Sequence, residues 1–202
     1  MKRTLISIDL DYFFSCDEYA RYIHHNLSYE DSWKSIYAIE HLFESKLEID
    51  DRLVDNIIDI LKGCNINDNV KIETFDEHDM MLTFLEECKE EKLNVINIDF
   101  HHDFSYNGDD SELNIENWVK LGFKKGIINN YVWFCRAMSE PVNFFPTVSL
   151  KTINPVFDKE RAVDEMKDID VCYIMFSISK HFTPSKYHEK ILETINKILQ
   201  II

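Results

Sequence analysis

The chain has 202 residues, of which 45% are hydrophobic, and a formal net charge of −15. This length fits one soluble globular domain spanning residues 1–202, because two domains would each have little chain with which to bury a core. The acidic balance argues against nucleic acid and anionic membranes as partners. No apolar run is long enough to cross a membrane. Five scattered cysteines without a CxxC pair favour free thiols, and Asp9 interrupts the apolar amino-terminal run too early for a signal peptide, so we expect a cytoplasmic protein.

Strands and amphipathic helices alternate in the first half of the chain. Short apolar runs predict strands, and apolar residues that recur every three or four positions predict helices. Gly63 is placed to end the helix at 50–61, and Asp76 is placed to cap the helix at 77–91, whose apolar face includes Met80. In chain order, these patterns predict a strand at 4–10, a segment of mixed helical character at 31–47, a helix at 50–61, a strand at 70–75, a helix at 77–91 and a strand at 93–99.

The second half resumes this alternation after a long turn-rich loop at 104–114. The most hydrophobic run, 171–179, is expected to be a central strand, and Pro184 suits the first position of the last helix. The pattern also predicts helices at 115–123 and 127–138 and a short strand at 147–150. Alternating strands and helices imply a mostly parallel sheet covered on both sides, so we assign the chain to the α/β class with a three-layer α-β-α architecture.

Two of the predicted strands end in side chains that bind metals. In an extended chain alternate residues project to one face, and ligand sites of open α/β sheets lie at the carboxyl ends of the strands. Carboxylates that met there would repel unless one or two divalent cations lay between them. An acidic surface loop is the alternative interpretation of each motif. The residues are Asp9 and Asp11 after the first strand, and Asp99, His101 and Asp103 after the strand at 93–99.

His78 is the sixth candidate ligand, because it falls in the first turn of a helix just past the strand at 70–75. His24, His25 and His41 compete for this role, but none of them follows a predicted strand. Four aspartates and two histidines are too many ligands for one Zn²⁺ and suit a pair of ions. Such ions lie about 3.5–4 Å apart and can share a bridging carboxylate. The excess of carboxylates favours Mn²⁺ or Mg²⁺ over zinc.

These residues resemble the binuclear manganese site of arginases and other ureohydrolases, whose fold is shared with histone deacetylases. In classical arginases the Asp-x-Asp strand follows the Asp-x-His-x-Asp strand, whereas here IDLDYFF stands near the amino terminus. That order is similar to the uncharacterised protein family 0489, as are a helix-start His before DFHHD and a late Ser-x-Ser-x-x-x-Thr-Pro at 177–184. This family includes the peptide arginases, which convert arginine side chains of ribosomal peptides to ornithine.

The resemblance implies two Mn²⁺ ions per chain and a role for each ligand. It implies hydrolysis of an arginine-containing peptide, or of a small guanidino substrate, with release of urea. Asp11 is implied as the catalytic carboxylate, which takes up a proton from the intermediate and passes it to the leaving amine. In the implied site, Asp9 and Asp99 bridge the ions, His78 and Asp103 complete one ion, and His101 and Asp11 complete the other.

The substrate-binding residues are less defined by the pattern. The strand at 171–179 lacks the acid with which arginases bind guanidinium, so Glu40, Glu77 or Glu140 would have to replace it. His181 is a candidate proton shuttle, although an exposed histidine beside a helix is the simpler interpretation. The remaining pocket candidates, each of which suits a helix cap or a core position equally well, are Asn117, Trp118 and Asn130.

Two other functions remain open from the sequence. A deacetylase-like amidohydrolase would need a single zinc ion held by Asp, His and Asp. A non-catalytic member of the fold would bind a peptide or a partner protein, although intact ligand sets at both strand ends argue against this. A homo-oligomer also remains open.

Overall fold

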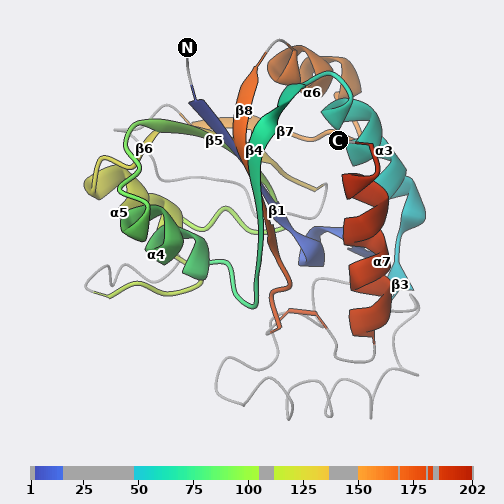
Figure 1. Ribbon diagram of the computed structural model, residues 1–202. Coiled ribbons are helices and arrows are strands. Elements are labelled where there is room, and N and C mark those ends of the chain that lie inside the picture. The colour runs from blue at the N-terminus through green and yellow to red at the C-terminus, as the bar shows by residue number, and fades with distance from the viewer. Residues whose placement is uncertain are drawn as a thin grey trace.

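The structure is a computed structural model that describes residues 3–15, 48–104, 112–136, 150–167, 169–180, 182–183 and 187–201. Its centre is a six-stranded sheet with the order β4-β8-β1-β5-β6-β7, in which every pairing is parallel (Figure 1). A two-residue antiparallel pair, β2 (Phe14–Ser15) and β3 (Glu48–Ile49), lies apart from it. The strands of the main sheet are β1 (Arg3–Asp9), β4 (Asn65–Phe75), β5 (Leu93–Ile98), β6 (Ile128–Phe134), β7 (Leu150–Ile153) and β8 (Asp170–Ser177).

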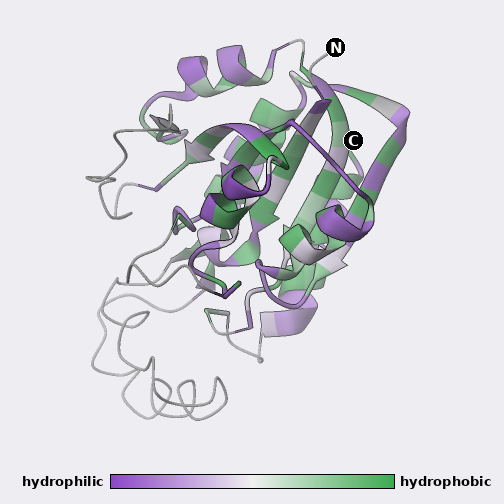
Figure 2. Cartoon of the chain, turned by 90° about the vertical axis from the view of Figure 1, so that its left-hand side faces the viewer, coloured by the Kyte–Doolittle hydropathy of each residue, from purple (hydrophilic) through white to green (hydrophobic). Residues whose placement is uncertain are grey.

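Helices cover both faces of the sheet, which confirms the predicted three-layer α/β fold. On one face lie α3 (Asp51–Leu61), α6 (Lys159–Met166) and α7 (His188–Leu199); on the other lie α4 (Met80–Glu87) and α5 (Trp118–Lys124), as Figure 1 shows. Alternate residues of each strand enter the two apolar layers; Ile6 and Ile8 of β1 pack with the first group, and Leu5 packs with the second. Figure 2 shows the resulting hydrophobic strands between helices of mixed hydropathy.

Among the helices that the structure describes, the longest has 12 residues, and none is long and apolar enough to cross a bilayer. The helix predicted at 50–61 is α3, and Asp50 caps it by accepting the backbone N–H of Arg52 at 3.0 Å. The segment 31–47 lies outside the described residues.

The helix predicted at 127–138 is wrong, because residues 128–134 form strand β6. This segment is rich in β-branched and aromatic residues, which favour a strand, and a short apolar run cannot be assigned from periodicity alone. Its side chains fill both layers: Tyr131 and Trp133 pack toward α4 and α5, and Val132 and Phe134 pack toward α3, α6 and α7. A strand buried on both faces loses the alternation that would have identified it.

The other differences concern boundaries around the predicted elements. Helix α4 is shorter than predicted, Met80 on it is 46% exposed, and Asp76 does not cap it but pairs with Lys180, whose Nζ lies 2.5 Å away. Strand β4 begins five residues early, with an irregular register between Ile66 and Lys71. The short strand expected at 147–150 corresponds to β7 (150–153), helix α6 was not predicted, and the last helix is α7 (188–199). Pro184, which was expected at the first position of this helix, lies outside the described residues, as do residues 147–149.

The connections leave the sheet in opposite directions at β1 and β5. The chain passes from β1 to β4 at one edge, whereas it passes from β5 to β6 on the other side. Ligands of open α/β sheets bind at the carboxyl ends of the strands where this reversal occurs. The topology therefore predicts a ligand site at the residues that follow β1 and β5.

Candidate metal centre

Asp9 and Asp99 follow adjacent strands in register. Ile8 of β1 pairs with Ile98 of β5, so the next residues on the two strands are these two aspartates. Neighbouring strands lie about 4.8 Å apart, which leaves two carboxylates side by side at the switch point. Both side chains are buried, Asp9 at 3% and Asp99 at 0% exposure.

Asp11 is brought to the same place by a turn, not by extended chain. After Asp9 the backbone enters the 3₁₀ helix η1 (Leu10–Phe13), and the Asp9 Oδ1 atom caps it by accepting the backbone N–H of Asp11 at 3.0 Å. The expectation that Asp9 and Asp11 project from one face of a strand is therefore wrong in its geometry. The two carboxylates are nevertheless both buried, and they lie close enough for the charge of Asp11 to raise the pKa of Asp9.

The Asp99–Asp103 segment also turns sharply once β5 has ended. Asp99 Oδ1 accepts the backbone N–H of His101 at 2.8 Å, and Asp103 has a φ of 51°. This left-handed conformation is unusual outside glycine, and aspartate tolerates it better than most residues. Because of this turn, His101 faces Asp11 whereas Asp103 faces His78. The alternate side chains thus serve two clusters instead of converging on one point.

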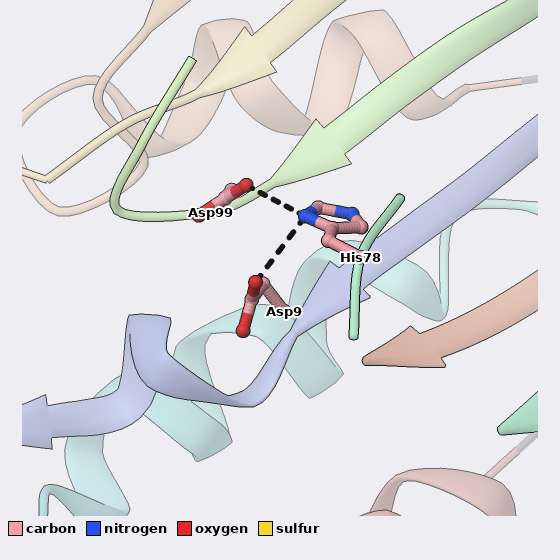
Figure 3. A group of neighbouring side chains, drawn as sticks. All are labelled: Asp9, His78 and Asp99. Carbon is pink, nitrogen blue, oxygen red and sulfur yellow. Dashed lines mark ion pairs between the residues drawn. The ribbon is translucent and has the colours of Figure 1, made fainter. Parts of the chain in front are cut away.

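His78 comes from the loop between β4 and α4 and reaches across the end of β8 to the two aspartates. Figure 3 shows one nitrogen of its ring facing both Asp9 and Asp99, with each residue on a separate segment. The His78 Nδ1 atom lies 3.2 Å from Asp9 Oδ2, 3.1 Å from Asp99 Oδ2 and 2.7 Å from Asp103 Oδ2. Among the described residues, this buried nitrogen has no hydrogen-bond partner of acceptable geometry.

These distances suit ligands that share a cation. Two ligand atoms at about 2.1 Å from an octahedrally coordinated ion, and at right angles to each other, are about 3.0 Å apart. Oxygen and nitrogen atoms that surround an ion position without hydrogen-bonding one another are separated by the same distances. Asp9, His78 and Asp99 form one such group of candidate ligands, with ligand atoms all within 4.8 Å of one another.

A second group consists of Asp11, Asp99 and His101. His101 Nδ1 lies 3.2 Å from Asp11 Oδ2 and 4.0 Å from Asp99 Oδ1. Asp99 therefore belongs to both groups and directs a different oxygen to each: Oδ2 to His78 and Oδ1 to His101. This is the arrangement of a carboxylate that bridges two ions.

The electrostatics of the cluster favour a positive occupant. Burial raises the pKa of Asp9 to about 7, and the charges of Asp11 and Asp99 act in the same direction. Burial, followed by the charge of Asp103, raises the pKa of Asp99 to about 7 as well. Burial alone would lower the pKa of His78, but the carboxylates around it outweigh this effect and raise its pKa well above the usual value. Divalent cations would relieve the same repulsion.

Further polar side chains hold the carboxylates in place. The Ser179 hydroxyl donates to Asp9 Oδ2, and the Ser177 and Ser179 oxygens lie 2.8 Å apart. The amide nitrogen of Asn97 lies 3.0 Å from Asp99 Oδ2 and 3.0 Å from the hydroxyl of Tyr131. Metal ligands are oriented by such outer hydrogen bonds. Asn97 was missed from the sequence, although an amide two residues before Asp99 in an apolar strand was a detectable signal.

Trp118 belongs to this outer set. Its side chain is fully buried, and its indole Nε1 donates to Asp103 Oδ2 at 2.6 Å. Its ring also lies against His78, with the ring centroids 4.9 Å apart. Trp118 thus contacts one candidate ligand through a hydrogen bond and another through its ring face.

The other two predicted pocket residues serve the scaffold. Asn117 is buried and organises the loop before α5: its Oδ1 accepts the backbone N–H of Asn114 at 2.9 Å, and its Nδ2 donates to the Glu112 carbonyl at 2.8 Å. Asn130 is exposed and hydrogen-bonds Asn94, and it lies four residues before the end of β6, or about 13 Å along the strand. The structure therefore does not bring Asn130 to the site, which corrects that prediction.

The remaining candidates fall partly outside the described residues. Glu40, Glu140, His24, His25, His41 and His181 all lie there. Glu77 is described and half-buried, directly before His78. Two aromatic rings flank His101, with centroid distances of 5.1 Å for Phe100 and 4.6 Å for Phe182.

A scan against protein-family models, a search of curated proteins and a search of solved structures each returned no match. The resemblance to ureohydrolases therefore depends on the sequence motifs alone.

Proposed function

We propose that this chain is a binuclear metal-dependent hydrolase of the ureohydrolase type. The proposal rests on the position of Asp99: its two buried carboxylate oxygens face two separate groups of candidate ligands. A single ion would need only one of these groups. A purely structural carboxylate would be expected to lie beside Lys or Arg, whereas in the described part of the chain the charged neighbours of Asp99 are three further aspartates and two histidines.

The ligand types favour Mn²⁺. Asp9, His78, Asp99 and Asp103 would hold one ion, and Asp11, Asp99 and His101 would hold the other. Oxygen-rich sites with a minority of imidazole suit manganese or magnesium, whereas cysteine- and histidine-rich sites suit zinc. The buried Nδ1 atom of His78 supports the first position, because carboxylate oxygens of Asp9, Asp99 and Asp103 lie 2.7–3.2 Å from it.

The proposed reaction is hydrolysis of a guanidinium group to an amine and urea, with the arginine side chain of a peptide as the substrate. When bound, two divalent ions supply a hydroxide near neutral pH by lowering the pKa of a water. Asp11 Oδ2, which lies 3.2 Å from His101 Nδ1, would carry the proton to the leaving amine. The net charge of −15 would draw a cationic substrate toward the chain.

The cysteines bear on where the protein works. Cys64, Cys88, Cys135 and Cys172 are free thiols in the described part of the chain. Burial raises the pKa of Cys64 to about 12 and that of Cys135 to about 11, so both thiols are unreactive. Four free thiols and no disulfide among the described cysteines are typical of a reducing compartment, so we propose the cytoplasm as the location.

Metal content and urea release test the proposal together. The purified chain loaded with Mn²⁺ should bind two ions and release urea from an arginine-containing peptide, and Asp99→Asn should lose both properties. One Zn²⁺ per chain with release of acetate from an acetylated peptide would favour the deacetylase-like alternative. A wild-type chain that binds two ions but releases no urea from arginine or from arginyl peptides would exclude the arginase activity.

A further inference from the structure

Ser7 places a hydroxyl where the sheet is otherwise apolar. It lies on β1, two residues before Asp9 and on the same face of the strand, and its side chain is fully buried. Leu5 and Val95 on this face belong to the apolar core beneath α4 and α5. A hydroxyl without a partner in such surroundings costs folding free energy, so the role of Ser7 is defined by what it contacts.

Two neighbouring atoms compete for the single hydroxyl hydrogen of Ser7. The Ser7 Oγ atom lies 2.6 Å from His78 Nε2 and 3.3 Å from Met81 Sδ. A thioether sulfur can only accept a hydrogen bond, whereas a hydroxyl can both donate and accept. When the hydroxyl hydrogen points at Met81, the Ser7 oxygen is left as an acceptor. The hydrogen in the short contact with His78 must then be carried by Nε2.

This assignment leaves Nδ1 as the ring atom of neutral His78 that has a lone pair. Nδ1 is also the atom that faces the carboxylates of Asp9, Asp99 and Asp103. A lone pair directed at three carboxylates is repulsive unless a cation or a proton lies between them. A metal-binding histidine usually donates its other ring N–H to a fixed acceptor, which sets both the tautomer and the ring orientation.

We propose that Ser7 is a positioning residue that holds His78 in the Nε2–H tautomer and thereby makes Nδ1 the metal-binding atom. The proposal rests on the metal site of the proposed function but not on its substrate or reaction. Met81, in the first turn of α4, completes the arrangement by taking the hydroxyl hydrogen. One buried hydroxyl thus links β1, α4 and the loop that carries the histidine.

The first test compares the Mn²⁺ affinity of three full-length chains by titration calorimetry. Ser7→Ala should bind Mn²⁺ about 10–100-fold more weakly than the wild type, which is the usual effect of removing the outer partner of a metal ligand. Thr4→Val is the matched control, because it removes another buried hydroxyl from β1 near the opposite end of the strand. The control should bind as the wild type does. Equal affinities of Ser7→Ala and the wild type would overturn the proposal.

The second test reads the tautomer of His78 directly from the ¹⁵N shifts of its imidazole, assigned by the signal missing in His78→Gln. The wild type loaded with diamagnetic Zn²⁺ should show a protonated Nε2 and a coordinated Nδ1. Met81→Leu keeps the hydroxyl but frees its hydrogen to point at Nε2, so the metal-free variant, measured at alkaline pH where the ring is neutral, should gain the Nδ1–H tautomer. A role of Ser7 in packing alone would leave the tautomer unchanged in this variant, and that result would contradict the proposal.

These outcomes separate the role of Ser7 from the metal site itself. Met81→Leu conserves side-chain volume, so it remains informative even where Ser7→Ala fails to fold. A wild-type chain that binds neither Mn²⁺ nor Zn²⁺ would remove the metal site, and the proposal with it. A wild-type chain that binds these ions, with affinity and tautomer unaltered in the variants, would refute the role of Ser7 alone.

Discussion

Replacing Asp99 with asparagine should change stability in opposite directions with and without metal. Asp99 is fully buried, and burial together with the charge of Asp103 raises its pKa to about 7 from an ordinary value of 3.8. When folding raises the pKa of a carboxyl, the free energy of unfolding decreases as the pH rises to the pKa of the folded state. At pH 8 the metal-free chain is therefore destabilised by the full amount. A change from 3.8 to about 7 corresponds to about 4 kcal/mol.

The neutral amide of Asp99→Asn removes this electrostatic destabilisation, and few favourable interactions are lost with the carboxylate. Its oxygen can still accept the backbone N–H of His101, but it can no longer accept from Asn97 as well. One lost hydrogen bond costs about 1 kcal/mol, so the metal-free variant should be about 3 kcal/mol more stable than the wild type. In a chain of this length each kcal/mol moves Tm by about 2–4 °C, which predicts a rise of about 6–12 °C in EDTA.

Mn²⁺ should reverse this order. At a free concentration of 100 times Kd, each bound ion adds about 2.7 kcal/mol to the stability of the wild type, and two ions outweigh the gain in the variant. Asp99→Asn lacks the shared carboxylate and should respond weakly. Melting curves at pH 8 in EDTA and in Mn²⁺ measure both values. If Asp99→Asn melts below the wild type by the same amount in both buffers, Asp99 is an ordinary structural residue and the reasoning fails.

Other perturbations test separate parts of the site. The Tm of the metal-free chain should fall between pH 5 and pH 8. The carboxyls of Asp9 and Asp99 ionise near pH 7 in the folded chain, and deprotonation of His78, whose pKa is raised, also lowers the free energy of unfolding. A flat or rising profile of Tm against pH in EDTA would contradict this. Trp118→Phe should weaken Mn²⁺ binding about tenfold in calorimetry, because Asp103 loses the indole N–H, and an unchanged affinity would show that this bond does not orient the ligand. Asn130→Ala should leave urea release unchanged, since Asn130 lies well before the end of β6, and a loss of turnover would return it to the substrate residues.

The fold class could be predicted from the sequence because alternation of strands and helices leaves few architectures. The assignment failed where local patterns are ambiguous, as at β6, whose apolar run is buried on both faces and imitates a helix. Helix α6 was missed because few apolar positions mark it: Ala162 and Met166 are its buried residues. Both misses come from tertiary context that a window of sequence does not contain.

The location of the site could also be predicted, since parallel strands carry their carboxyl ends to one edge. The structure brings together all six predicted ligands: Asp9, Asp11, His78, Asp99, His101 and Asp103. The sequence pattern does not predict which carboxylate oxygen faces which histidine ring, because this depends on the 3₁₀ helix after β1 and on the left-handed turn at Asp103. Outer residues such as Asn97 and Trp118 depend on the same turns and on packing between distant segments.

The central claim is that Asp99 joins two cations in one site. Electron paramagnetic resonance of the chain loaded with Mn²⁺ tests this most directly, because two ions bridged by a carboxylate are magnetically coupled whereas isolated ions are not. We predict the spectrum of a coupled pair in the wild type and its loss in Asp99→Asn. A wild-type spectrum of isolated Mn²⁺ ions alone, or no bound Mn²⁺ at all, would contradict the claim.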